Sequence, residues 1–598
     1  MKRIMWTIML LLCIEARGYG QEVFQKEKRD YIWLIGYGGG PNVLQPAIKM
    51  DFHYSPVWIG NDPKHLDFDI TNANISDAEG NLLFYTNGIA IHNHLNELME
   101  NGDGLNPDPF TDWWVHGGYI IPQSTLVLPY PENTDQYYLL HNATSIASEP
   151  VYGSNYVALK FYYSLIDMSL NEGAGKVIEK NSLVIQDSID HGKIVATRHA
   201  NGRDWWILSQ KLFSNRYNRM LLSPEGLVVK PMQEVGIPTA SGWGQAVFSP
   251  DGSKYVHFTT YNIQDGQFLD IYDFERCSGL LSNPTHIRYN DTAFCAGVAI
   301  SPNSRFLYVS SFVYVYQYDL WADDIEASKQ LIAVYDGFES PPPSSTTFFL
   351  GQLAPDDKIY ISSNNGVKHM HVIHNPNAPF PDCQMEQHGV ELPAYYFGGL
   401  PNHPFYGLGP EDGSPCDTLG IDHHPQADFR YVTETSTVNF YDYSRFFPSG
   451  WFWTFGDGSS STERNPVHTY AENGVYEVCL IVSNANASDT LCQEVEVIVT
   501  GTAEAVVEKA VLKVFPNPAK DYVVLQVPDR EAVLRLQAAG LLTWTLHDAL
   551  GREVRRVVLQ HPEAQTVASL ENVAPGMYFW HLTAGGITVQ TGKLSVVR

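Results

Sequence analysis

The chain lacks most of the sequence signatures that mark a catalytic centre or a nucleic-acid partner. It contains no G-x-S-x-G nucleophile elbow, no Walker phosphate loop and no HExxH zinc motif. Basic residues are few: 38 Lys and Arg stand against 66 Asp and Glu, for a formal charge of -28. A surface of that sign repels phosphate, so we expect no nucleic-acid partner.

Long apolar runs are missing after the N-terminus, where no segment reaches eighteen consecutive apolar residues. We therefore expect no transmembrane helix. Residues 1–20 open with two basic residues, continue with an apolar run from Ile4 to Ile14 and close with small residues up to Gly20. This pattern predicts a cleaved secretory signal peptide and passage through the periplasm, with a buried N-terminal helix as the alternative.

Cysteine is scarce, with seven residues in all, of which six follow the signal peptide. An even number in an oxidising compartment indicates disulfides, and zinc is the weaker alternative because no C-x-x-C pair exists. Sequence alone does not determine the connectivity. Proximity along the chain predicts Cys277–Cys295, Cys383–Cys416 and Cys479–Cys492.

Aromatic residues, in contrast, make up 13% of the chain and recur in a regular pattern. Six times, a polar turn precedes a short aromatic-rich strand, at intervals of about fifty residues that stretch once across residues 141–200. The six strands read LLFYT, QYYLL, DWWIL, KYVHF, FLYVS and IYISS. Such residues suit strands because they fit a pleated, half-buried surface.

A repeat of this length with several short strands per unit is typical of a β-propeller blade. One four-stranded sheet cannot bury both faces alone, whereas blades packed face to face around an axis can. We therefore expect an all-β fold with a β-propeller of seven blades over residues 31–410. Residues 31–60 together with 370–405 are expected to form the seventh blade. An array of β-sandwiches or a β-solenoid is the alternative.

Three stretches of the repeat region are distinctive in combination: ISDAEGNLLFYTNGIAIHN (75–93), ATRHANGRDWWIL (196–208) and HVIHNPNAPFPDC (371–383). They resemble a family of secreted Bacteroidetes proteins that carry propeller-like repeats before a PKD domain. The resemblance covers most of residues 60–405. It implies a fold but no reaction, because the family has no established activity.

Residues 425–500 change character and resemble a PKD domain, which implies an Ig-like β-sandwich. Trp453 and Tyr476 are expected in its core. Asp457 and Gly458 are expected to form a tight turn, with Asp457 as a calcium or sugar ligand the alternative. The hallmark residues are Trp453, Phe455, Asp457, Gly458, Tyr470, Gly474 and Tyr476.

Residues 501–510 are predicted to be a linker, and residues 511–598 resemble a type IX secretion C-terminal sorting domain. Residues 501–598 hold 9 acidic and 10 basic residues, so the acidity of the chain lies before them. The resemblance implies handling by the type IX machinery, then removal of the domain and attachment or release. A structural sandwich is the alternative. The motif residues are Pro516, Asn517, Pro518, Gly551, Gly576, Tyr578 and Lys593.

Metal sites were sought among closely spaced His and Asp residues. The histidine groups lack an evident third ligand, and the acidic loops lack the D-x-[DN]-x-[DN]-G pattern, so polar or solvated loops are the default reading. No cofactor is expected other than, as the alternative, a structural calcium. The candidates are His92, His94, His369, His371 and His374, with Asp62, Asp67 and Asp69 in one loop and Asp103, Asp108 and Asp112 in another.

Two tryptophan pairs, Trp113–Trp114 and Trp205–Trp206, lie beside predicted loops. Exposed rings would stack on sugar faces, although core packing is the default interpretation. The leading hypothesis is a non-enzymatic secreted or surface protein that binds a glycan or a protein. A polysaccharide- or peptide-degrading hydrolase or lyase and a structural surface-layer component are the alternatives. Paired carboxylates or a His–Asp pair in the axial depression would favour the enzyme, whereas an aromatic-lined mouth would favour binding.

Overall fold

The computed structural model describes most of the chain, which divides into one compact unit up to Val497 and another from Ile498 onward. Within the described residues, no helix is long and apolar enough to cross a membrane. The predicted signal peptide (1–20) and linker (501–510) lie outside the described residues. Described are residues 22–23, 27–37, 46–64, 66–151, 154–239, 242–262, 266–291, 297–422, 425–434, 436–444, 448–484, 487–497, 512–515, 517–526, 542–548, 552–559, 566–570, 573–584 and 587–597.

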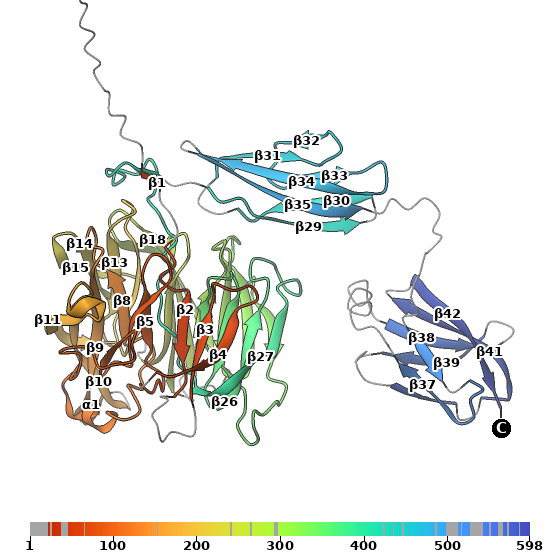
Figure 1. The fold of residues 1–598 in the computed structure, drawn as a ribbon, viewed down its shortest axis with the longest axis horizontal. Coiled ribbons are helices and arrows are strands. Elements are labelled where there is room, and N and C mark those ends of the chain that lie inside the picture. Colours follow the sequence, from red (N-terminus) through yellow and green to blue (C-terminus); the bar gives the residue numbers. More distant parts are fainter. Residues whose placement is uncertain are drawn as a thin grey trace, which may run out of the picture. The chain divides into compact units, whose positions relative to one another are not determined.

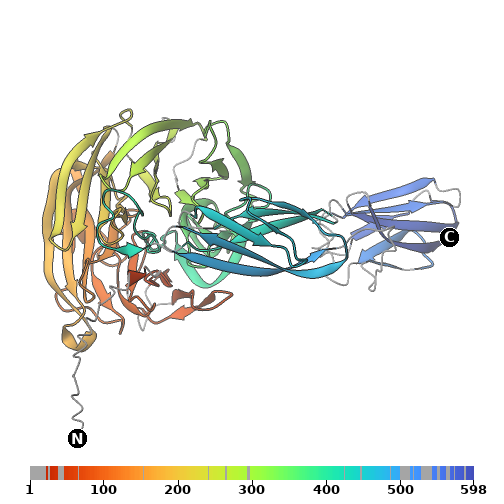
Figure 2. The ribbon, with the colours of Figure 1, turned by 90° about the horizontal axis from the view of Figure 1, so that it is seen from above.

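Seven antiparallel sheets between residues 32 and 397 form a seven-bladed β-propeller, as predicted (Figures 1 and 2). Each sheet is a meander of consecutive strands. In chain order the sheets contain β2 (Ile32–Ile35), β3 (Ala47–Asp51) and β4 (Trp58–Asp62); β5 (Ala73–Ser76), β6 (Leu82–Thr86) and β7 (Ile91–Asn93); β8 (Thr125–Pro129), β9 (Gln136–Val151), β10 (Ser154–Asp167) and β11 (Lys176–Ile189); β12 (Val195–Arg198), β13 (Trp205–Gln210), β14 (Arg216–Ser223) and β15 (Gly226–Glu234); β16 (Trp243–Phe248), β17 (Lys254–Asn262), β18 (Gly266–Glu275) and β19 (Leu280–Tyr289); β20 (Gly297–Ile300), β21 (Phe306–Ser311), β22 (Tyr314–Asp319) and β23 (Gln330–Val334); and β24 (Phe348–Leu353), β25 (Ile359–Ser363), β26 (Gly366–Ile373) and β27 (Met385–Phe397).

The six recurrent aromatic strands of the sequence are the second strands of six blades: β6, β9, β13, β17, β21 and β25. A second strand has a hydrogen-bonded neighbour on each side and a packed sheet on each face. Every residue of β13 is therefore buried, including Trp205 and Trp206, whose side chains point to opposite faces. The core-packing interpretation holds for this tryptophan pair.

The seventh blade differs from the expectation. Residues 32–62 form a three-stranded sheet of their own, whereas residues 366–397 complete a sheet with β24 and β25, so the composite blade predicted from 31–60 and 370–405 is wrong. The first and last sheets meet through side chains rather than strand pairing: the ring of Trp33 packs edge-on against that of Tyr360 at 5.8 Å.

Residues 399–409, which we call the axial segment, run through the centre of the ring. At one end, Gly399 leaves no room for a Cβ, which would lie 2.8 Å from the backbone oxygen of Ile70. At the other end, Arg276 donates to the backbone oxygen of Gly409 at 2.5 Å. Cavities of about 30 and 40 Å³ remain beside the segment. The axial segment therefore fills the channel that the blades would otherwise enclose.

Asn402, at the middle of the axial segment, is buried, and its side chain is hydrogen-bonded to two other parts of the ring. Its Nδ2 donates to the backbone oxygens of Thr125 and Ile194 at 2.8 and 2.9 Å. Its Oδ1 accepts from Nε2 of Gln123 at 3.1 Å. These bonds satisfy backbone groups along the free edges of innermost strands, which no neighbouring strand can reach.

Two glutamines continue the same role around the axis. Gln123 exchanges two hydrogen bonds with the backbone of Ala246, at 2.9 and 3.0 Å. Oε1 of Gln245 accepts from the backbone nitrogens of Val298 and Gly351, each at 3.0 Å, and its Nε2 donates back to the oxygen of Gly351 at 2.6 Å. Three buried amides thus connect the inner strands of five blades.

Two of the predicted disulfides are wrong. Cys277 pairs with Cys416, 139 residues away, which excludes both Cys277–Cys295 and Cys383–Cys416. The axial segment returns the chain to the turn between β18 and β19, so distance along the sequence was a misleading guide. Cys383 is buried as a free thiol, and Cys295 lies outside the described residues.

Residues 429–497 form two facing sheets of a β-sandwich. Cys479 and Cys492 are opposite residues of two adjacent strands and form the third predicted disulfide, with a Cα separation of 4.0 Å. The strands are β29 (Phe429–Glu434), β30 (Thr437–Asp442) and β33 (Val467–Thr469), facing β31 (Gly450–Thr454), β32 (Ser460–Ser461), β34 (Gly474–Ser483) and β35 (Ser488–Val497), while β1 (Glu22–Val23) pairs with β28 (Ile421–Asp422) outside them.

The hallmark residues of this sandwich divide between core and turn. Trp453, Phe455 and Tyr470 are buried, whereas Tyr476 is half-exposed and stacks on the ring of Tyr470 at 4.2 Å, so its expected place in the core is corrected. Gly458 has a φ of +90°, as the predicted tight turn requires.

Asp457 is engaged within its own sandwich. Its carboxylate accepts from the backbone nitrogen of Ser459 at 2.9 Å and pairs with Nε2 of His468 at 2.7 Å. Although burial opposes it, these bonds lower the pKa of Asp457 to about 2. The carboxylate therefore stabilises the turn.

The C-terminal unit is a second sandwich around Trp544, a fully buried residue. Asn517 connects its two ends, donating to the backbone oxygen of Lys593 and accepting from the nitrogen of Ser595, both at 2.9 Å. Pro516 and Gly551 lie outside the described residues. The strands are β36 (Lys513–Phe515), β37 (Tyr522–Gln526) and β40 (Thr566–Ser569), facing β38 (Leu542–His547), β39 (Glu553–Val558), β41 (Gly576–Ala584) and β42 (Ile587–Val596).

Replacing Asn402 by Ala is expected to lower the free energy of unfolding of the propeller by about 3 kcal/mol, because buried carbonyls of two blades lose their donor. Chemical denaturation of the mature protein, followed by tryptophan fluorescence, measures the change. Asn61→Ala, at an exposed position of β4, is the matched control and should change little. Equal stability of the two variants would contradict the role assigned to Asn402.

Candidate binding site at the mouth of the propeller

A pocket of about 570 Å³ lies where several innermost strands begin, at the end of the axis that we call the mouth. Trp243 and Phe349 stand at the starts of β16 and β24, and Ile70 and Ile120 precede β5 and β8. This volume is typical of sites for small ligands. The lining residues are Tyr37, Asp69, Ile70, Trp114, Ile120, Trp243, Phe349, Asn364 and Phe397.

Most of the pocket wall is aromatic. Tyr37, Trp114, Trp243 and Phe397 are half-buried, whereas Phe349 is 2% exposed. Among the described residues, Tyr37, Trp243, Phe349 and Phe397 make no ring stacking and no cation contact with another side chain. Elsewhere in the propeller such rings pack against one another, as Trp33 and Phe52 do at 5.0 Å. Trp114, Trp243 and Phe397 pack against the core on one side and leave the rest of their half-buried rings to the pocket.

A short helix determines which member of the first tryptophan pair enters the pocket. Helix α1 (Pro109–Trp113) begins at Asp108, whose carboxylate caps the backbone nitrogen of Phe110 at 3.0 Å. The helix ends before Trp114, which lines the pocket, whereas Trp113 points to solvent with 68% of its surface exposed. Core packing was the default for this pair; Trp114 packs in part against Phe110, whereas Trp113 does not pack in the core.

Asp69 is the only carboxylate among the described lining residues. It is half-buried, and a Cβ on Gly117 would lie 2.8 Å from its Oδ2, so Gly117 permits the close approach. None of the described residues forms a hydrogen bond or ion pair with the Asp69 carboxylate. Burial, together with the charge of Asp67, raises the pKa of Asp69 to about 6.

A buried lysine holds one side of the mouth. Nζ of Lys64 donates to the backbone oxygens of Gly36, Tyr37 and Leu66 at 2.9, 3.0 and 2.8 Å. The three donors of an ammonium group are thereby matched by three carbonyls. Lys64 thus joins the segment that carries Tyr37 to the segment that leads to Asp69.

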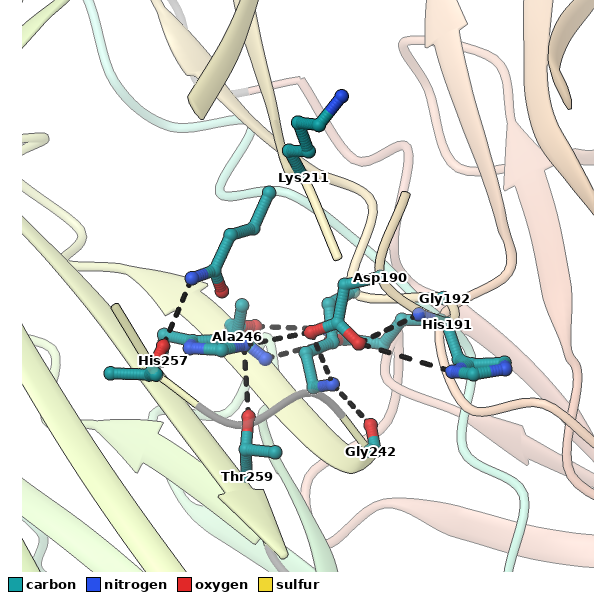
Figure 3. A network of polar contacts seen from close by, with 12 residues as sticks. Asp190, His191, Gly192, Lys211, Gly242, Ala246, His257 and Thr259 are labelled. Carbon is teal, nitrogen blue, oxygen red and sulfur yellow. Dashed lines mark hydrogen bonds and ion pairs between the residues drawn. The ribbon is translucent and has the colours of Figure 1, made fainter. Parts of the chain in front are cut away.

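A buried charge network lies behind the opposite side (Figure 3). The Asp190 carboxylate pairs with Nζ of Lys193 at 2.8 Å and with Nε2 of His257 at 3.3 Å. Although burial opposes it, the ammonium of Lys193 and the imidazole of His257 hold the pKa of Asp190 well below its usual range. Lys193 also donates to the backbone oxygen of Gly242, so the network holds the residue before Trp243.

This network contains the His–Asp pair that would favour an enzyme, but the pair is enclosed. The side chains of Asp190, Lys193 and His257 are 2%, 3% and 1% exposed. A catalytic group must come within hydrogen-bond reach of its substrate, which these side chains cannot do. Neither charge network was predicted, since nothing in a single sequence signals that Lys64 or Lys193 is buried.

Several of the remaining candidate ligands are engaged within the fold. No group of three or more His, Cys, Asp or Glu side chains in the described part of the chain could hold a metal ion. His371 is fully buried, and His374 pairs with Glu386 at 2.7 Å. Of the acidic loops, Asp103 pairs with Lys180 at 3.3 Å.

Comparison with known proteins assigns two regions of the chain. A family model of the PKD domain matches residues 423–499, and a model of the secretion system C-terminal sorting domain matches residues 513–597. The chain carries a PKD domain and a type IX sorting domain. Both resemblances are confirmed, and the sorting domain indicates export to the cell surface or secretion.

No curated protein matches the sequence. Among solved structures, the PKD1 domain of Vibrio anguillarum Epp is 30% identical, with 13% of this chain and 96% of that chain covered and a TM-score of 0.13. The PKD1 domain of the Vibrio cholerae metalloprotease PrtV is 31% identical, with 13% and 99% covered and a TM-score of 0.13. A Lactobacillus plantarum protein is 10% identical, with 62% and 99% covered and a TM-score of 0.34.

Replacing Asp69 by Asn is expected to raise the melting temperature above pH 6. The pKa of Asp69 in the folded protein, about 6, lies above its ordinary value of 3.8, so ionisation destabilises the folded state. The gain should shrink as the pH falls through 6 and vanish below about 4. Scanning calorimetry across this range measures it, with the exposed Asp135→Asn as control. A gain independent of pH would contradict the assignment.

Proposed function

We propose that the protein is a secreted or surface-displayed binding protein whose ligand occupies the mouth of the propeller. The observation that carries the proposal is the aromatic lining of the pocket, in which Tyr37, Trp114, Trp243 and Phe397 are half-buried and Phe349 lies behind them in the core. Aromatic rings exposed to a pocket gain most from a ligand that covers their faces. A glycan ring or an apolar side chain of a protein presents such a surface.

Binding is favoured over hydrolysis by the polar groups of the pocket. Glycoside hydrolysis needs two carboxyl groups about 5–10 Å apart on either side of the scissile bond. Asp69 is the single lining carboxylate in the described part of the pocket, and the Asp190–His257 pair is buried behind the wall. In this proposal the PKD domain serves as a spacer, and the sorting domain addresses the protein to the surface.

Replacing Trp114 or Trp243 by Ala is expected to weaken ligand binding about tenfold each, because each change removes one stacking ring. The mature protein is screened on a glycan array and incubated with polysaccharides, and each ligand found is titrated against the variants by calorimetry. Trp113→Ala is the matched control, since that neighbouring ring points to solvent.

Equal losses for Trp113→Ala and Trp114→Ala would contradict a site in the pocket. Release of polysaccharide fragments by the mature protein, abolished by Asp69→Asn, would instead support the hydrolase or lyase alternative.

Deleting residues 511–598 is expected to leave the protein in the periplasm, because the type IX machinery would lose the domain that it handles. Cell fractionation with immunodetection of the propeller measures the location. The full-length chain that carries Trp113→Ala serves as the exported control. Normal surface delivery of the truncated chain would contradict the export route.

A further inference from the structure

The propeller itself contains one example of a cation that lies near aromatic rings and a carboxylate. Nζ of Lys329 lies 3.9 Å from the ring centroids of both Tyr289 and Tyr316. The hydroxyl of Tyr316 donates to the carboxylate of Asp291 at 3.1 Å. Burial lowers the pKa of Lys329, and the charge of Asp291 opposes this change. Rings and carboxylate thus share one cation.

The mouth has the same two components without the cation. Its rings make no cation contact among the described residues, and the Asp69 carboxylate has no partner there. The charge facing Asp69 from its own loop is that of Asp67, which has the same sign. The ammonium of Lys64 is already held by three carbonyls, one of them that of Tyr37.

We infer that the mouth binds an organic cation, a substituted ammonium group with apolar substituents, placed between Asp69 and the aromatic wall. The inference rests on the proposed binding function and names the chemistry of its ligand. The group would compensate the half-buried carboxylate and cover ring faces, whose electron-rich centres attract positive charge. The formal charge of -28 also concentrates cations near the protein.

Other ligand classes fit these groups less well. A neutral sugar would cover the rings but leave the Asp69 carboxylate desolvated and unpaired, which is costly. A divalent metal ion needs several oxygen ligands, whereas one carboxylate faces the pocket. An anion would be repelled by Asp69 and Asp67. The volume of about 570 Å³ exceeds a trimethylammonium group, so the pocket has room for a ligand that extends beyond its charged end.

The test compares choline with an uncharged molecule of the same shape and adds a second, aromatic cation. Choline and benzyltrimethylammonium are titrated into the mature protein by calorimetry, and 3,3-dimethylbutan-1-ol serves as the uncharged isostere of choline. We expect choline to bind at least tenfold more tightly than its isostere. Asp69→Asn should remove that preference while raising the melting temperature at pH 7.5, which separates loss of binding from loss of folding. Trp114→Ala should weaken both cations.

Asp135→Asn and Trp113→Ala are the matched controls and should leave cation binding unchanged. Equal binding of choline and its isostere, or no binding of either cation, would overturn the inference. If the cations fail but Trp114→Ala still weakens a ligand found on the glycan array, the binding function stands without its cationic ligand. If Trp114→Ala affects no ligand at all, the proposed site itself fails.

Discussion

The free edges of the innermost strands impose the constraint on which the propeller depends. Each blade pairs its strands internally, so the backbone groups along the axis have no neighbouring strand and are shielded from water. Asn402, Gln123 and Gln245 supply the missing donors and acceptors with their side-chain amides. Because Asn402 belongs to the axial segment, the end of the propeller chain completes bonds that its earlier blades require.

Filling the axis has a consequence for function: a ligand can reach the ring only from its ends. Buried charged groups hold the segments that form the mouth in place. Lys64 binds three carbonyls on one side, and Lys193 joins Asp190 to Gly242 on the other. Buried ions with complete partners are rigid supports, since leaving any of them unpaired would be costly.

Asp69 differs from the buried ions of these networks, which all have partners. Its half-buried carboxylate has no partner among the described residues, and its pKa is raised to about 6, so it costs stability at neutral pH. The aromatic rings beside it are only half-buried, apart from Phe349. A half-buried carboxylate that the fold does not compensate is expected at functional sites. Asp69 therefore supports the proposal that a ligand occupies the mouth.

The sequence by itself determined what depends on neighbours along the chain: the recurrent aromatic strands, the PKD and sorting motifs, and the pairing of Cys479 with Cys492 across one hairpin. Alternation and turn chemistry are local, so they can be read without coordinates. Only the tertiary structure decided the strand content of the first blade, the pairing of Cys277 with Cys416, and the meeting of Asp69 with Trp243 at the mouth. Those contacts join segments more than a hundred residues apart, and closure of the ring, which no local pattern encodes, brings them together.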